Sequence, residues 1–101
     1  PDSLADIPML PISAVKTRYY LRLIAQDRTG VLADITRILA NHDISVDAML
    51  QTEVDDTTKQ AHIVIMTHVS QESNVDTAVS EIKALESISG EVVKLRVEEL
   101  G

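Results

Sequence analysis

At residues 19–32 the chain reads YYLRLIAQDRTGVL, in which a strand-like run passes through a short polar loop into a helix-like run. Before the loop, apolar side chains fall on every second residue, at Tyr19, Leu21, Leu23 and Ala25. After the loop they recur at helical spacing, at Val31, Leu32, Ile35, Ile38 and Leu39. The stretch therefore predicts a strand, a tight connection and an amphipathic helix, in that order.

The connecting loop favours the binding of a small anionic group. A strand that turns directly into a helix leaves the first helical N–H groups unpaired, beside the positive end of the helix dipole, where a carboxylate binds well. Gly30 lets a ligand approach the backbone without meeting a Cβ, and the Asp27 carboxylate can accept a hydrogen bond from an ammonium group. The loop thus indicates a site for a free amino acid. Alternatively, Asp27 serves only as an N-cap and Gly30 only eases packing of the first turn.

The composition limits the size, partners and location of the protein. Its 101 residues suffice for one domain, whose core must be aliphatic because only two residues are aromatic. The net charge of -7 repels phosphate backbones, so we expect no nucleic-acid partner. Without cysteines or a long apolar run, we expect a soluble, cytoplasmic protein with no membrane partner. The first residue is proline, so we also expect the chain to be part of a longer protein.

The rest of the chain alternates between strands and helices. Residues 1–17 hold all three prolines without periodicity, which is typical of an arm or linker, so the predicted domain is residues 18–101. Within it we expect strands at Tyr19–Ala25, Ile44–Val54, Ala61–Val69 and Val92–Val97, and helices at residues 30–42 and from Ser73 onward.

Local signals mark the ends of these elements. Asn41-His42-Asp43 ends the first helix, and Ser73 with Asp76 resembles a capping box at the start of the second. Gly90 is predicted to lie in the loop before the last strand. That strand is charged along one side, at Glu91, Lys94, Arg96 and Glu98, which guards it against pairing at an edge.

The order β-α-β-β-α-β predicts an α+β, ferredoxin-like sandwich: a four-stranded antiparallel sheet with two helices on one face. Right-handed crossovers put the first and third strands in the middle, the second beside the third and the fourth beside the first. The opposite face then carries a partly apolar set of side chains, Arg22, Ile24, His62, Val64 and Met66. We therefore expect a homodimer, formed through the weakly guarded edge of the second strand or through this open face.

Motifs for catalysis are absent from the sequence. Three glycines cannot form a dinucleotide-binding turn or a P-loop, and the three histidines are too far apart to share an ion. Asp55 and Asp56 are explained by turn formation, and the serines have no histidine at a predictable position to activate them. The chain is therefore not expected to be an enzyme, to bind metal or to hold a cofactor of its own.

The pattern resembles the ACT domain, a βαββαβ regulatory module that binds a free amino acid between two copies. The resemblance is carried by Tyr20-Leu21-Arg22-Leu23, Asp27-Arg28-Thr29-Gly30, Val31-Leu32, Ile35, Ile38-Leu39 and Ile44-Ser45-Val46. It implies ligand contacts from Asp27, Arg28, Thr29 and the amides of Gly30, Val31 and Leu32 on one subunit, with Ser45 contributed by the other. Thr29 stands where the family often has proline.

A narrower similarity, to the C-terminal ACT regions of homoserine dehydrogenases, covers nearly the whole chain. It is carried by Leu10-Pro11-Ile12-Ser13, Tyr19-Tyr20-Leu21-Arg22, Gln51, Thr67-His68, Glu72-Ser73-Asn74 and Arg96-Val97-Glu98. It implies feedback control, with L-threonine as effector, of a tethered catalytic domain in an NAD(P)-dependent parent enzyme of threonine and methionine synthesis. Two alternatives stay open: a purely structural dimerisation domain, and a small hydrolase for which Arg28 beside Gly30 is the only hint.

Overall fold

The computed structural model describes residues 16–26, 29–52 and 56–97, which form a βαββαβ fold with one short extra strand. The elements are β1 (Lys16–Gln26), α2 (Val31–Asn41), β2 (Val46–Gln51), β3 (Gln60–Thr67), β4 (Ser70–Gln71), α3 (Glu72–Lys83) and β5 (Ile88–Val97). The predicted ferredoxin-like order is confirmed. The extra strand β4 has two residues, too few to produce a periodic pattern in the sequence.

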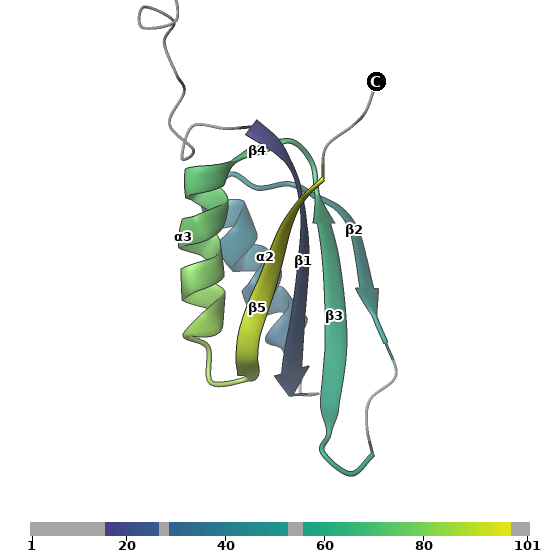
Figure 1. Cartoon of the computed structure of the whole chain (residues 1–101). Coiled ribbons are helices and arrows are strands. Elements are labelled where there is room, and N and C mark those ends of the chain that lie inside the picture. Colours follow the sequence, from purple (N-terminus) through teal and green to yellow (C-terminus); the bar gives the residue numbers. More distant parts are fainter. Residues whose placement is uncertain (1–15, 27–28, 53–55, 98–101) are drawn as a thin grey trace, which may run out of the picture.

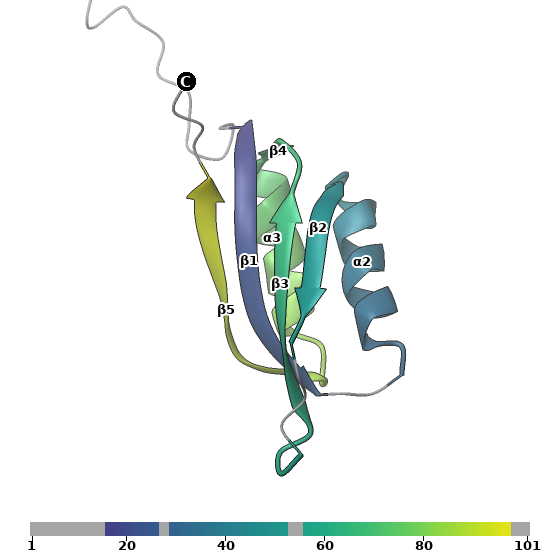
Figure 2. The same ribbon diagram turned by 90° about the vertical axis from the view of Figure 1, so that its right-hand side faces the viewer.

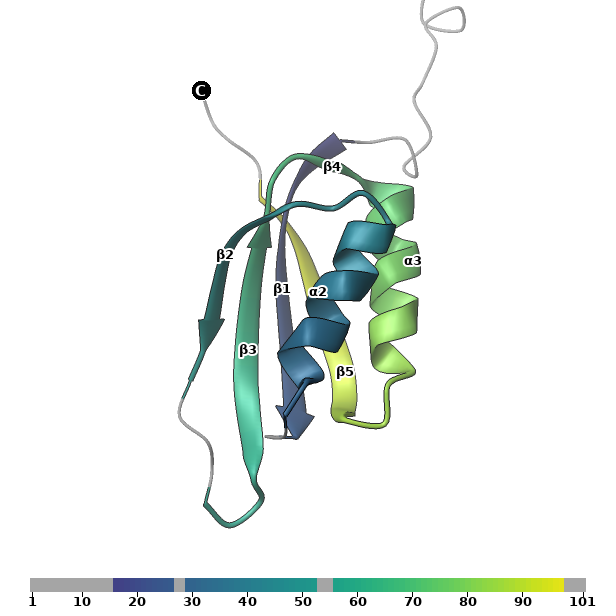
Figure 3. The same ribbon diagram turned by 180° about the vertical axis from the view of Figure 1, so that it is seen from behind.

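The sheet has the predicted strand order. β2 pairs with β3, β3 with β1, and β1 with β5, all antiparallel, while β4 pairs with the first residues of β1. Both described helices cover one face of the sheet, as the edge-on view of Figure 2 and the view from behind in Figure 3 show, and neither of them lies on the other face. Within the described segments, neither helix has the length and apolar character needed to cross a membrane.

The core lies between this sheet and the helices (Figure 1). β1 is buried on alternate residues, as predicted, and in the β1–β3 register Leu21 stands opposite Ile65 and Leu23 opposite Ile63. Apolar residues of both helices close over these strands; those with no exposed surface are Ile35, Leu39, Val75, Ala78 and Ile82. Aliphatic burial of this kind is the main favourable term in folding, so β1 and β3 position everything else.

Several predicted element ends are wrong. Gly90 lies inside β5 at a φ of +70°, where the register between β1 and β5 shifts. Ser73 is not an N-cap: α3 begins one residue earlier, at Glu72, and no side chain caps its start. His68 lies beyond the end of β3, and β2 is shorter than predicted at both ends, although Val54 falls outside the described residues.

The central position of β3 leads to a prediction on stability. Ile65→Ala should lower the free energy of unfolding by about 2–5 kcal/mol, because it removes methyl groups from a fully buried site and leaves a cavity. Leu50→Ala on β2 removes a similar volume at a site that is 61% exposed, and should cost about 0.5 kcal/mol or less. Urea unfolding at equilibrium measures both, and equal losses would contradict this arrangement of the core.

Candidate ligand-binding site

The candidate site lies where β1 passes into α2. Gly30 is the N-cap residue of α2 with a φ of +90°, in the left-handed region, and no side-chain hydrogen bond caps this end of the helix. Thr29 and Gly30 are both exposed. Asp27 and Arg28 lie outside the described residues, so their predicted ligand contacts stay predictions. Since Gly30 itself occupies the N-cap position, Asp27 is not the N-cap residue.

Gly30 is required here for its backbone conformation, and the space above it is open. A Cβ built on Gly30 would have no atom within 4 Å apart from those of the residues next to it in the chain. The space beside Gly30 at the helix start is therefore not filled by the described part of the chain. A side chain other than glycine, or to a lesser degree asparagine, would be strained at this φ. The space beside Gly30 is therefore open, and ligand binding there stays a prediction.

The next residues anchor the helix start to the core. Val31 is 5% exposed and belongs to the core, while Leu32 is half-buried and packs against it. Only their main-chain N–H groups are thus suited to bind a ligand. The Asp34 carboxylate in the first turn accepts a hydrogen bond from Arg37 Nη2 at 3.0 Å. This pairing partly offsets a negative charge that would otherwise oppose an anion at the same helix end.

Ser45 lies at the other end of α2. It is exposed in the connection between α2 and β2 and lines a surface depression of about 410 Å³, together with Thr36, Asp43 and Val46. Because α2 has 11 residues, about 16 Å of helix separates this depression from the Gly30 end, and Figure 3 shows the two ends apart. One chain alone does not bring Ser45 and Gly30 together.

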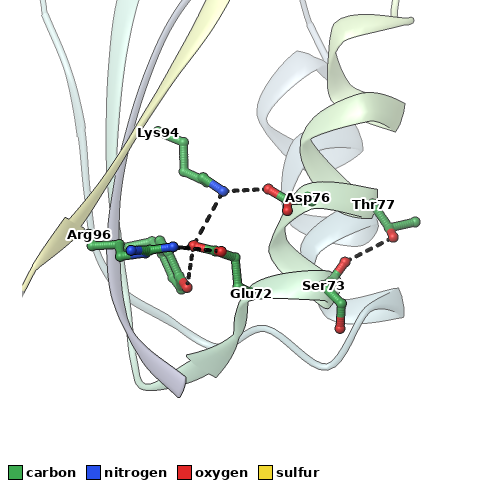
Figure 4. Close-up of polar contacts among 7 residues, drawn as sticks. Glu72, Ser73, Asp76, Thr77, Lys94 and Arg96 are labelled. Carbon is green, nitrogen blue, oxygen red and sulfur yellow. Dashed lines mark hydrogen bonds and ion pairs between the residues drawn. The ribbon is translucent and has the colours of Figure 1, made fainter. Parts of the chain in front are cut away.

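A buried polar cluster joins α3 to the sheet, and the sequence analysis assigned it no role. Glu72, the first residue of α3, is 2% exposed. Its carboxylate accepts two hydrogen bonds from Arg96, each 2.8 Å long, and one from the Tyr19 hydroxyl at 3.1 Å. Lys94 Nζ lies 3.5 Å from Glu72 Oε1 and also pairs with Asp76 (Figure 4). Lys94 and Arg96 therefore point at α3 and do not guard the edge of the sheet.

A signal for this cluster was present in the sequence. Val92, Lys94 and Arg96 follow each other at the strand period, and Val92 packs against the core, so the two cations belong to the helix-facing side of β5. The Asp76 carboxylate, interpreted as half of a capping box, instead binds Lys94.

The cluster shifts the pKa of its members. Hydrogen bonds from Arg96 dominate at Glu72 and, against the effect of burial, lower the pKa of its carboxyl group from 4.5 to about 2. Burial and, after it, the hydrogen bond to Glu72 raise the pKa of Tyr19 from 10.0 to about 12. The same pairing with Glu72 raises the pKa of Arg96. At neutral pH Glu72 is thus ionised and Tyr19 is neutral, an arrangement suited to structural support.

Two of the three histidines each contact one carboxylate. His42, the C-cap residue of α2, places Nε2 at 3.0 Å from Glu81 of α3, and His68 places Nε2 at 3.6 Å from Asp47 of β2. Across the described stretches, no three His, Cys, Asp or Glu side chains gather where they could hold a metal ion. These pairs link neighbouring elements, in line with the structural role expected of the histidines.

Comparisons with known proteins give consistent relatives. The family model of the ACT domain matches residues 19–87. Over 99% of its length the chain is 54% identical to a homoserine dehydrogenase of Methylobacillus glycogenes and 39% identical to one of Pseudomonas aeruginosa. It spans 24% and 23% of these two relatives, about a quarter of their length.

Solved structures agree with this similarity. The structure of a homoserine dehydrogenase from Thiobacillus denitrificans matches 99% of this chain with a TM-score of 0.87 and 52% identity, over 22% of that protein. The ACT domain of a GTP pyrophosphokinase from Chlorobium tepidum matches 80% of this chain, over its whole length, with a TM-score of 0.64 and 15% identity. The second likeness supports the fold alone.

The lowered pKa of Glu72 predicts an acid-sensitive fold. Its carboxyl group has a pKa of about 2 in the folded chain and 4.5 as the ordinary value, so its stabilising effect is complete above pH 4.5 and lost as the pH falls towards 2. Glu72→Gln should remove this part of the pH dependence of the unfolding free energy, measured by urea unfolding. Glu86→Gln, at an exposed position, is the matched control, and an unchanged pH profile in Glu72→Gln would contradict the pairing.

The raised pKa of Tyr19 predicts a second loss at alkaline pH. The phenol of Tyr19 has a pKa of about 12 in the folded chain and an ordinary value of 10.0. Its contribution to the unfolding free energy is therefore complete below pH 10 and is lost between pH 10 and 12. Tyr19→Phe should abolish this alkaline loss and cost about 1 kcal/mol at neutral pH, the worth of one hydrogen bond. Thermal unfolding from pH 7 to 12 measures it, with Tyr20→Phe as control. A Tyr19→Phe profile that still falls between pH 10 and 12 argues against this assignment.

Proposed function

The chain belongs to the ACT domain family, and from this premise we propose that it is the C-terminal regulatory domain of a homoserine dehydrogenase and binds L-threonine. Its identity of 54% and 39% to homoserine dehydrogenases, of which it spans about a quarter, supports this parent enzyme. The catalytic domains and the NAD(P) site then belong to the rest of the longer protein. In this role, L-threonine, as the end product of threonine synthesis, would regulate the catalytic domain by feedback.

The open start of α2 is the observation that carries the proposal. It offers main-chain N–H groups and the positive end of the helix dipole to a carboxylate, next to an exposed Gly30 with free space above it. The Asp27 carboxylate is the partner for the ammonium group of the amino acid. In this proposal the carboxylate of the amino acid binds the N–H donors, and its ammonium group binds the Asp27 carboxylate of the same loop.

A second copy would complete the site with Ser45. Antiparallel pairing of the β2 edges turns the second copy upside down, so its Ser45 end comes level with the Gly30 end of the first copy. Of the two helices, α2 lies nearer to β2 than α3 does (Figure 3). Effector binding across the two chains would favour one dimer geometry, which a tethered catalytic domain senses as a population shift.

The proposal predicts a response of thermal stability to threonine. A ligand that binds only the folded state stabilises it by about 2.7 kcal/mol at a hundred times its dissociation constant. L-threonine should therefore raise the melting temperature of the protein in a concentration-dependent way, measured by scanning calorimetry against glycine and L-lysine. A dimer whose melting temperature ignores threonine at millimolar concentration would support the purely structural role.

A pair of variants tests the position of the site. Gly30→Asn adds a side chain over the helix start while keeping a residue that tolerates positive φ, and should reduce the threonine response at least tenfold in ligand concentration, about 1.4 kcal/mol in binding. Gly90→Asn makes the same change at a φ of +70° in β5, on the opposite edge strand, and should leave the response intact. A normal threonine response in Gly30→Asn would place the site elsewhere.

A further inference from the structure

The face of the sheet opposite the helices carries two straight rows of apolar side chains. Each row crosses all four long strands, as the registers of β2, β3, β1 and β5 define it. The first row is Ala48, Met66, Tyr20 and Leu95. The second row is Leu50, Val64, Arg22 and Val93. We call these eight residues the open face.

The open face is both exposed and hollowed. Leu50 and Leu95, at its two edges, are 61% and 54% exposed. A depression of about 540 Å³ lies on the β1–β5 side of the open face and is lined by Tyr20, Arg22, Met66, Val93, Leu95, Arg96 and Val97. Seven apolar side chains side by side on a sheet are more than a surface in water ordinarily leaves uncovered.

Arg22 is the one charge within the open face, and it stands on the central strand β1. Among the residues that the structure describes, its guanidinium group has no hydrogen bond or ion pair. In the described part of the chain, the carboxylates that border the open face are already paired, since Asp47 contacts Arg18 and His68, and Glu91 contacts Lys83 at 2.8 Å. A carboxylate on the molecule that covers the open face would therefore compensate the charge of Arg22.

This charge pattern disfavours a second copy as the occupant. Two open faces packed against each other would bring both Arg22 side chains near the centre of the contact, where the described residues of neither chain offer a spare carboxylate. Burying two like charges without partners is costly and opposes the gain from the apolar contact. The edge of β2 is the route to a dimer that avoids this cost.

We infer that the open face docks against the polypeptide that precedes this chain in the longer protein, on an apolar surface whose carboxylate pairs with Arg22. The inference rests on the proposed function, because it requires a larger protein of which this chain is the regulatory part. Most of each relative lies outside the matched quarter, so a partner of sufficient size is present in the same molecule. The preceding polypeptide is covalently joined to this chain ahead of β1, the strand that carries Arg22.

Site-specific crosslinking in the full-length protein tests the docking. A photo-crosslinking amino acid at Leu95 should form bonds to residues that precede this chain, of the same or a neighbouring subunit, identified by mass spectrometry of the digested protein. Crosslinks from Leu95 to the ACT domain of a second copy, or none at all, would overturn the inference. The same probe at Thr77, exposed on α3 behind the sheet, measures the non-specific background.

Charge variants test the role of Arg22. Arg22→Glu should lower the specific crosslinking from Leu95 by about tenfold or more, because it sets a negative charge against the partner's carboxylate, whereas Arg22→Lys should keep most of it. Arg37→Glu, at an exposed position of α2, is the matched control. Circular dichroism checks that each variant folds. If Arg22→Glu does not fold, Arg22→Gln should still lower the yield. Unchanged crosslinking in a folded Arg22→Glu or Arg22→Gln protein overturns the pairing.

The threonine response, measured on the same protein, separates this inference from the proposed function. A threonine-dependent rise in melting temperature without specific crosslinks rejects the docking and leaves the regulatory role intact. Specific crosslinks without any threonine response support the docking and reject threonine as effector.

Discussion

The arrangement of α3 on the sheet depends on the hydrogen bonds and ion pairs made by the buried carboxylate of Glu72. A charge in a nearly dry site is costly unless its hydrogen bonds are complete. Here Arg96 supplies two and Tyr19 a third, so β1, β5 and the start of α3 meet at one point. In the described part of the chain, no buried side-chain polar atom is left without a partner. Because removal of Arg96 would take away the main countercharge and two hydrogen bonds of Glu72, the cluster favours one position of α3 on the sheet.

This point lies at one end of β1, and the candidate ligand site lies at the other. Tyr19 stands near the start of β1, close to where the chain enters the domain, while Gly30 follows the end of the same strand. The entry end is held by the ion pairs of the buried Glu72, whereas the loop end is held by the packing of Val31 and by backbone hydrogen bonds such as the one from Gln26 to Ser87. β1 thus connects three places: the start of the domain at Tyr19, the open face at Arg22 and the candidate ligand site after its end.

The periodic patterns of the sequence predicted the strands and helices. Single contacts between residues far apart in the chain could not be predicted in this way. The alternation from Tyr19 to Ala25 and the helical spacing after Gly30 gave the elements, their order and the buried face, because burial follows the strand and helix periods. The Glu72 cluster was missed because its hydrogen-bonded partners are far apart in the chain, with Tyr19 and Glu72 53 residues apart. The capping-box interpretation of Ser73 and Asp76 was wrong for the same reason, since Lys94 competes for Asp76. The exposed helix start at Gly30 was foreseeable, but Ser45 can reach it only from another chain.

The central claim is that the amides at the start of α2 receive the carboxylate of a small amino acid. Nuclear magnetic resonance of the ¹⁵N-labelled protein during titration with L-threonine tests it most directly, because each amide reports its own environment. The account predicts that the largest saturable shifts are those of Gly30, Val31 and Leu32, with smaller ones at Ser45. Absence of any shift at millimolar threonine, or shifts confined to residues far from the start of α2, would contradict it.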